Sequence, residues 1–157
     1  MTTDEHWMTL ALQEAAMAAE KGEVPVGAIV LSDGELIGRG HNLRETDQDP
    51  LAHAELIALR SAADRIGSWR LVGCTLFVTL EPCAMCAGAL VNSRIERVVF
   101  AASDPKAGYC GSLGNIAQDE RLNHRVQICR GVLQEKSTVM LREFFAALRQ
   151  TDLQQAS

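Results

Sequence analysis

The sequence predicts an α/β fold, a three-layer sandwich in which helices cover both faces of a β-sheet. Apolar runs typical of strands are separated by single segments with helical spacing. The pair Asp33-Gly34 between the first two runs indicates a tight hairpin at one edge of the sheet. The 157 residues, 47% hydrophobic and 22% charged, suffice for one globular core. We therefore expect a single domain over residues 1–157, with its core over about 5–150 and a flexible tail over 151–157.

Each element is indicated by its apolar spacing and by the residues that end it. Gly22 and Gly67 follow segments with helical spacing and are plausible helix stops. Residues 75–80 are apolar almost throughout, which is typical of a strand buried on both faces, and Pro82 suits the first turn of the next helix. The expected strands are 26–31, 35–40, 75–80, 97–101 and 125–129, and the expected helices are 4–21, 52–66, 84–91 and 135–150.

Composition and charge argue against several classes of protein. No run of about eighteen apolar residues occurs, and residues 1–6 are polar and acidic, unlike a secretory signal, so we expect a cytoplasmic protein without a membrane span. The net charge of −5 argues against a sequence-indifferent nucleic-acid coat, but it permits a local basic strip that serves one structured RNA. Five cysteines, an odd number, indicate metal ligands or core thiols better than a disulfide framework.

The pair Cys83 and Cys86 is the first candidate for chemistry. The two residues are three apart at an expected helix start, so both sulfurs can project from one face. The free N–H groups and the positive dipole end favour the thiolate, the form that binds zinc. By itself the spacing also fits a redox pair or two buried helix cysteines.

His53 strengthens the zinc interpretation. One imidazole and two thiolates make three protein ligands, which leave the fourth position of a catalytic zinc open for water. A lone histidine at this place would otherwise be a helix cap or a surface group. We expect the other three histidines, His6, His41 and His124, to be surface or loop residues.

Glu55 lies two residues after His53, so it points to another side of the same helical turn. From there a carboxylate can reach a metal-bound water, whose pKa zinc lowers to about 7, without binding the metal. It can accept the proton and deliver it to a substrate nitrogen. The alternative is the ordinary one for a helical glutamate, a solvated carboxylate.

The motifs His53-Ala54-Glu55 and Pro82-Cys83-Ala84-Met85-Cys86 resemble the signature of the zinc-dependent nucleoside and nucleobase deaminases. The flanking stretches are similar to the tRNA-specific adenosine deaminases of bacteria, over about residues 5–150. Tyr109-Cys110 departs from that pattern, where small residues are expected. The similar stretches are Gly22–Ala28, Thr79–Ala89, Ser93–Ile95, Asp104–Gly108, Gly111–Leu113, Asn123–Val126 and Phe144-Phe145.

The resemblance implies a cytidine deaminase-like fold with a five-stranded mixed sheet, and a homodimer. It implies zinc-dependent hydrolysis of adenosine to inosine at wobble position 34 of a tRNA anticodon stem-loop, with no organic cofactor. One Zn²⁺ per subunit would be held by His53, Cys83 and Cys86, zinc-bound hydroxide would be the nucleophile, and Glu55 would shuttle protons.

Substrate-binding residues are expected outside the metal site. Asn42 matches a family residue that contacts the target base, although Asn is also a common turn residue. Lys106 and Arg149 are candidate phosphate contacts, and Phe145 is a candidate stacking surface. Further candidates are Arg70, Arg94 and Arg142; for any one arginine taken singly, a solvated surface charge is the favoured interpretation.

Two other functions remain open at this point. The same zinc chemistry would serve a deaminase of a free nucleobase or nucleoside, of the guanine or cytosine type. A zinc-stabilised binding module without catalysis would need a fourth protein ligand, which only an approach by Cys74, Cys110 or another side chain could supply.

Overall fold

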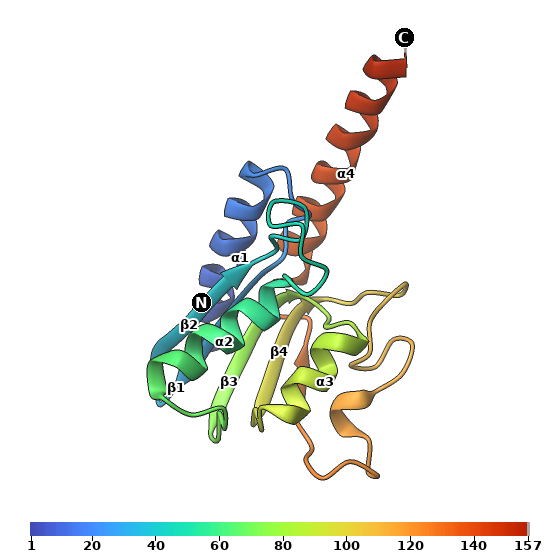
Figure 1. The fold of residues 1–157 in the computed structure, drawn as a ribbon. Helices are drawn as coiled ribbons and strands as arrows, with labels where there is room; N and C mark the ends of the chain where they lie inside the picture. The colour runs from blue at the N-terminus through green and yellow to red at the C-terminus, as the bar shows by residue number, and fades with distance from the viewer. Residues whose placement is uncertain (157) are drawn as a thin grey trace.

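The computed structural model describes residues 1–156 and contains the helix–sheet–helix sandwich that the sequence predicts (Figure 1). The strands are β1 (Gly27–Ser32), β2 (Glu35–His41), β3 (Cys74–Leu80), β4 (Arg97–Ala102) and β5 (Gln127–Arg130). The helices are α1 (Thr3–Glu20), α2 (Ala54–Ile66), α3 (Ala84–Asn92), the short 3-10 helix η1 (Ile116–Gln118) and α4 (Gln134–Ala156).

The five strands form one mixed sheet in the order β2-β1-β3-β4-β5. The hairpin β1–β2 is antiparallel, and β1 also pairs antiparallel with β3. β3, β4 and β5 are parallel, so their carboxyl ends meet at one edge. That edge is where an open α/β sheet usually holds its ligand.

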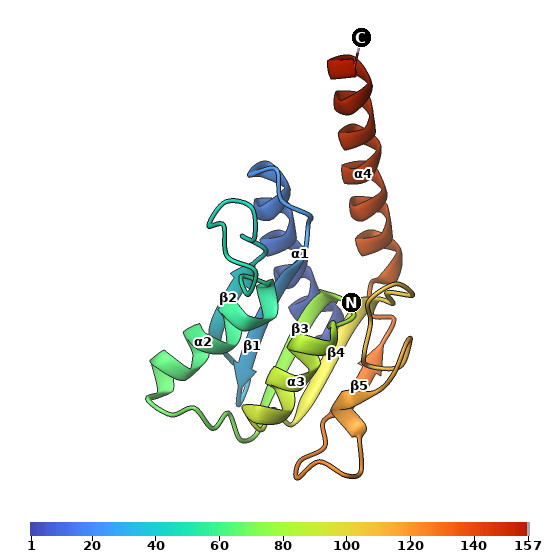
Figure 2. The same cartoon turned by 45° about the vertical axis from the view of Figure 1, so that its right-hand side comes forward.

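Alternate residues of the central strands pack into separate layers. Leu76 and Val78 of β3 lie in the core beneath α2 and α3, whereas Phe77 between them faces the layer that holds α1 and Met140 of α4. Because β3 is buried on both faces, it carries the continuous apolar run that the sequence shows. Figure 2 shows α2 and α3 side by side on one face of the sheet, with α1 on the other.

Close backbone approach sets the position of α2. A Cβ added at Gly38 of β2 would lie 2.4 Å from the carbonyl oxygen of Ala58 and 2.8 Å from the backbone nitrogen of Ala62. The helix therefore rests directly on the strand backbone, which glycine alone allows. This contact fixes the height at which the N-terminus of α2 stands above the sheet.

The N-termini of α2 and α3 lie together at the carboxyl edge of β3 and β4, and α4 projects beyond the body at the same end (Figures 1 and 2).

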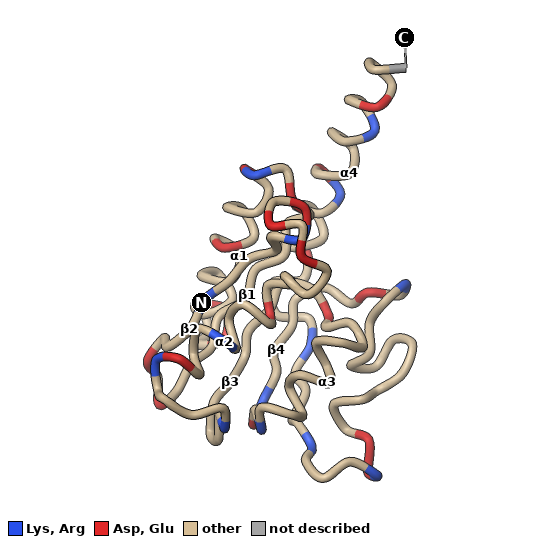
Figure 3. Tube along the Cα trace, viewed as in Figure 1, with Lys and Arg blue, Asp and Glu red and all other residues tan. Residues whose placement is uncertain are grey.

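Acidic and basic residues are interspersed over the elements, including along α4 (Figure 3). None of the helices in residues 1–156 is long and apolar enough to cross a membrane.

Some elements differ from the expectations. The last helix, expected over 135–150, continues to Ala156, so residues 151–156 are helical where the sequence predicted a tail; residue 157 lies outside the described residues. β5 is displaced by one or two residues relative to the expected 125–129. The expectation that His41 lies at the surface or in a loop is wrong. His41 is the last residue of β2 and is buried between Glu14 and Lys21, because both of its ring nitrogens find hydrogen-bond partners there.

Candidate active site

Two helix N-termini bring three candidate metal ligands together. His53 is the N-cap of α2, Cys83 is the N-cap of α3, and Cys86 lies in the first turn of α3. The Nδ1 atom of His53 lies 3.7 Å from the Sγ atom of Cys83 and 3.5 Å from that of Cys86, and the three ligand atoms lie within 4.8 Å of one another. A tetrahedral zinc with ordinary Zn–N and Zn–S bonds separates its ligand atoms by about 3.5–3.8 Å. These residues can therefore hold a metal, and their donor set fits zinc.

The electrostatics of the two cysteines favour one thiolate. A hydrogen bond from the Cys86 side chain lowers the pKa of Cys83 to about 4; burial opposes this, and a hydrogen bond with His53 assists it. The same bond to Cys83, together with burial, raises the pKa of Cys86. The hydrogen bond with Cys83 also raises the pKa of His53, against the effect of burial. Binding of a metal would thus displace protons from this group.

The ligand group leaves room for a fourth partner. Within residues 1–156, the cluster of His, Cys, Asp and Glu ligand atoms consists of His53, Cys83 and Cys86. Cys74 and Cys110, which might have closed the site, are buried but are not part of this cluster. Three protein ligands with an open fourth position are typical of a catalytic zinc, whereas a structural zinc is closed by four.

Glu55 stands beside the ligand group in the first turn of α2. Its side chain is 4% exposed, and it lines the same pocket as His53 and Cys83. Burial raises the pKa of the Glu55 carboxyl, and the positive charge of His53 and the helix N–H oppose the rise in part. A carboxyl with a raised pKa can both accept and return a proton near neutral pH.

The pocket opens above these groups, between two loops. Its walls come from the α1–β1 connection, the loop after β2, the starts of α2 and α3, and the loop after β4. The lining residues are Val24, Val26, Asn42, Arg44, His53, Ala54, Glu55, Leu80, Glu81, Cys83, Asp104 and Ala107.

Asn42 lines the pocket and also takes part in a turn. Its Nδ2 atom donates to the carbonyl oxygen of Val24 at 3.3 Å, and its Oδ1 atom accepts from the backbone N–H of Arg44 at 3.1 Å. The second bond is the Asx turn that the sequence offered as the alternative for this residue. Asn42 is buried, so the turn holds its amide in one orientation at the pocket wall.

Glu81, which the sequence reasoning did not single out, secures the loop after β4. Its buried carboxylate accepts hydrogen bonds from the backbone N–H groups of Asp104, Cys110 and Ser112, each at 3.0 Å, and from the hydroxyl of Ser112 at 2.5 Å. Burial alone would raise the pKa of Glu81, but these bonds lower it. The backbone N–H of Tyr109 adds a bond to the carbonyl oxygen of Pro82, so Tyr109 and Cys110 help to anchor this loop.

The other predicted substrate contacts lie outside the pocket lining. Lys106 is exposed in the loop after β4, although its neighbour Ala107 lines the pocket. Phe145 is 40% exposed on α4, edge-on to Phe144, and Arg149 is exposed one turn further along. Of the remaining candidates, Arg70 and Arg94 stack on Trp69, and Arg142 is exposed on α4.

Residues missed by the sequence reasoning include Arg44 and Asp104 of the pocket lining, and the buried acids Glu23 and Glu81. Glu23 is followed by Val24 and Pro25, and Glu81 lies between Leu80 and Pro82. An acid beside an apolar residue and close to a proline was the available signal, because burial of a charge requires dedicated partners.

Several known proteins are similar to this chain. Residues 2–149 match the family described as MafB19-like deaminase. The tRNA-specific adenosine deaminase of Bacillus subtilis strain 168 is 54% identical over 149 residues, which cover 95% of this chain and 92% of the relative. A structure from biochemical and structural studies of A-to-I editing by tRNA:A34 deaminases at the wobble position superposes with a TM-score of 0.84 at 40% identity, covering 87% of this chain and 99% of that one. A guanine deaminase from Nitrosomonas europaea has a TM-score of 0.79 at 26% identity, covering 93% and 86%.

Proposed function

We propose that this chain converts adenosine to inosine at position 34 of a tRNA anticodon. The chain belongs to the MafB19-like deaminase family, and its relatives include the tRNA-specific adenosine deaminases. The observation that carries the proposal is the convergence of His53, Cys83 and Cys86 beside the buried Glu55, at the floor of a pocket. The identity to tRNA-specific relatives favours this substrate.

One zinc ion per subunit is assigned to His53, Cys83 and Cys86, because the separation of their donor atoms fits a tetrahedral site. Bound there, zinc lowers the pKa of a coordinated water to about 7 and thereby supplies the nucleophile at neutral pH. The cysteines neutralise most of the metal charge, and the two helix N-termini favour the thiolates.

Glu55 carries the protons of the reaction. It accepts a proton from the attacking water and delivers it to the ring nitrogen next to C6 of adenine, which makes that carbon a better electrophile. The bond between C6 and the exocyclic amino nitrogen then breaks, and the amino group leaves as ammonia after taking up the second proton of the added water. Adenosine and water thus yield inosine and ammonia, and no organic cofactor is required.

The pocket selects and orients a base that has left the anticodon stack. Asn42, with its amide held at the wall, is assigned to the target base. Lys106 and Arg149 are assigned to phosphates of the stem-loop, and Phe145 to stacking on a neighbouring base, since all three are exposed. α4 projects at the end of the molecule where α2 and α3 begin (Figure 1), and residues at the starts of these two helices line the pocket, which supports this assignment.

A homodimer is part of the proposal. α3 contains no charged residue, and Ala84 and Met85 in its first turn stay at least partly exposed. The buried residues of the same helix, Ala87, Leu90 and Val91, belong to the core of the monomer and give no support to the homodimer.

We also propose that the protein acts in the cytoplasm, since its proposed substrate is a tRNA.

The decisive experiment is detection of inosine after incubation with an anticodon stem-loop that carries adenosine 34, with and without a zinc chelator. We expect turnover that the chelator abolishes and that added zinc restores. Adenosine, cytidine, cytosine and guanine are the parallel substrates, because the guanine deaminase shares the fold. Turnover of a free compound alone would contradict the tRNA substrate.

A further inference from the structure

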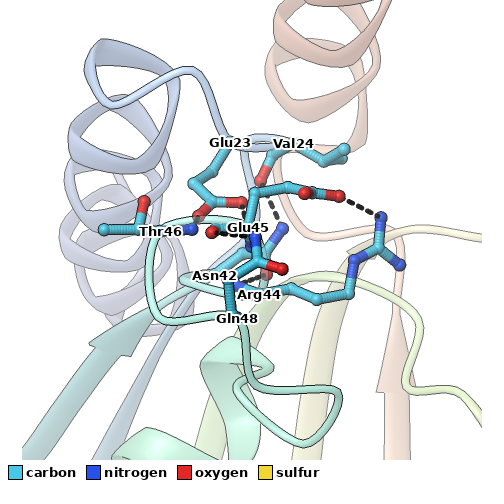
Figure 4. Close-up of polar contacts among 7 residues, drawn as sticks. All are labelled: Glu23, Val24, Asn42, Arg44, Glu45, Thr46 and Gln48. Atoms are coloured by element: carbon cyan, nitrogen blue, oxygen red, sulfur yellow. Dashed lines mark hydrogen bonds and ion pairs between the residues drawn. The ribbon is translucent and has the colours of Figure 1, made fainter.

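The α1–β1 connection, residues 21–26, lies against the loop that follows β2, residues 42–49 (Figure 4). This loop contributes Asn42 and Arg44 to the pocket wall. The backbone N–H of Asn42 donates to the carbonyl oxygen of Val26 at 3.1 Å, which continues the pairing of β1 with β2. Beyond this point the loop leaves the sheet and needs other partners to keep its shape.

Glu23 supplies those partners. It is 1% exposed, and its Oε1 atom accepts from the backbone N–H of Glu45 at 3.2 Å, while its Oε2 atom accepts from that of Thr46 at 2.6 Å (Figure 4). Burial alone would raise the pKa of Glu23, but the hydrogen bonds from Thr46 and Glu45 lower it, so the carboxylate is ionised at neutral pH. Bonds from N–H groups to a charged oxygen are roughly twice as strong as neutral ones.

Within the loop, the backbone N–H of Leu43 donates to the carbonyl oxygen of Ala52 at 3.0 Å and that of Asp47 to the carbonyl oxygen of Leu43 at 2.8 Å, but these bonds do not reach the α1–β1 connection. Val24, next to Glu23, accepts from the Asn42 amide, and Asn42 in turn accepts from the Arg44 N–H. The ion pair of Arg44 with Glu45 is 4.0 Å long and exposed on both sides, so it holds the loop little. Glu23 is thus the charged anchor between the connection and the segment that carries Asn42 and Arg44.

We propose that Glu23 is a positioning residue for substrate binding: its carboxylate holds residues 44–46 so that Asn42 and Arg44 face the pocket. Glu23 is absent from the pocket lining and therefore acts through the loop. The inference rests on the proposed function for the identity of the substrate. It assigns to Glu23 an effect on substrate affinity that is separate from the proton transfer by Glu55.

The test is Glu23→Gln in the zinc-loaded protein, with the anticodon stem-loop as substrate. A glutamine has the same shape, but its NH₂ group must face one of two N–H donors, which breaks one bond. We expect KM to rise about tenfold, the equivalent of about 1.4 kcal/mol, with kcat within about threefold of the wild type. We also expect the amides of Glu45 and Thr46 to exchange with solvent at least about tenfold faster.

The matched control is Asp4→Asn, which removes the ion pair of α1 with Arg97 of β4, far from this loop in the fold. It should lower stability without changing KM or the exchange of Glu45 and Thr46. Glu23→Asp keeps the charge with a shorter reach, so its KM should lie between those of the wild type and Glu23→Gln. This variant carries the test if Glu23→Gln does not fold.

The outcomes separate this inference from the proposed function. The exchange measurement needs no substrate, so faster exchange in a protein that does not deaminate the stem-loop would overturn the function alone. Unchanged exchange and KM in a Glu23→Gln protein with normal turnover would overturn the positioning role alone. A fall in kcat at constant KM would also overturn it.

Discussion

Single side chains carry the chemistry of this molecule, and burial decides how they behave. Glu55 and Glu23 are both acidic and almost fully buried, yet their pKa values shift in opposite directions. For Glu55 the loss of water dominates and raises the pKa, whereas for Glu23 the hydrogen bonds from Thr46 and from the backbone N–H of Glu45 outweigh the effect of burial and lower the pKa. The first carboxyl is suited to moving a proton and the second to holding a structure.

The variant Glu55→Gln separates proton transfer from metal binding. The amide fills the same space but cannot accept the proton from water, so we expect deamination of the stem-loop to fall by about 10²–10⁴-fold. Zinc content should stay at one per subunit, since Glu55 is not part of the ligand cluster. Inosine formation and metal analysis of the same preparation check both points. Activity close to that of the wild type would refute the assigned role.

The lowered pKa of Glu23 predicts a pH-dependent contribution to stability. Because the folded pKa lies below the unfolded value of about 4.3, the carboxylate stabilises the fold at higher pH, and this contribution is lost as the pH falls through the folded pKa. Glu23→Gln should therefore lower the free energy of unfolding by about 1–3 kcal/mol at neutral pH. The difference from the wild type should shrink towards pH 3.

Urea denaturation of both proteins over about pH 3–7 measures this difference. The charged groups that face Glu23, the Arg44 guanidinium and the Glu45 side chain that pairs with it, are present in both proteins and cancel in the comparison. A difference that stays constant down to the lowest pH would show that the ionised form is not the stabilising one.

At the scale of elements, small residues bring the helices to their positions. α2 lies directly on β2 at Gly38, and the same helix carries His53 at its cap and Glu55 in its first turn. A shift of α2 along the strand would therefore move the proposed metal ligand and the proposed proton carrier together. The precision of the site depends on this helix–strand contact as much as on the motif itself.

We predict that Gly38→Val destabilises the protein by about 1–3 kcal/mol or more, because its Cβ would meet the backbone of Ala58 and Ala62. Valine favours strands, so the loss must come from this contact and not from propensity. Glu35→Val in the same strand is the control: its side chain is exposed, and its removal costs a surface ion pair with Arg65 worth about 0–1 kcal/mol. Equal losses in urea denaturation would contradict the prediction.

For the whole molecule, we propose that the tRNA stem-loop contacts one end and that the second subunit contacts one face. The pocket and the projecting α4 lie at the same end, which suits a stem-loop that inserts one base and lays its backbone alongside (Figure 2). The uncharged α3 lies on the face that also carries α2. The homodimer that we propose would cover part of this face.

Light scattering of the zinc-loaded protein should give a mass of about twice the 17.1 kDa of one chain. Gly88→Glu places a charge on the exposed side of α3, where an added Cβ meets no atom within 4 Å, so the monomer should fold and the dimer should weaken. A monomeric wild type at working concentration would contradict the dimer. An unchanged dimer in Gly88→Glu would exclude this side of α3 as its interface.

Local sequence patterns were enough to predict the secondary-structure elements and the residue types at the site. Apolar periodicity and the glycine and proline positions reflect local backbone preferences, so the strands and the helices α1, α2 and α3 could be predicted to within about two residues of their ends. The motifs around His53 and Cys83 likewise indicated zinc chemistry, since the spacing of ligands on a helix start is a local property.

Contacts between groups that are distant along the chain could not be predicted in this way and are seen only in the folded molecule. The bonds from Glu45 and Thr46 to Glu23, and from Cys110 and Ser112 to Glu81, join segments more than twenty residues apart, and no local pattern encodes them. The burial of His41 was missed for the same reason, since its partners Glu14 and Lys21 lie on or next to α1. Long-range contacts follow from how helices pack on the sheet, and that packing orients the loops that line the pocket.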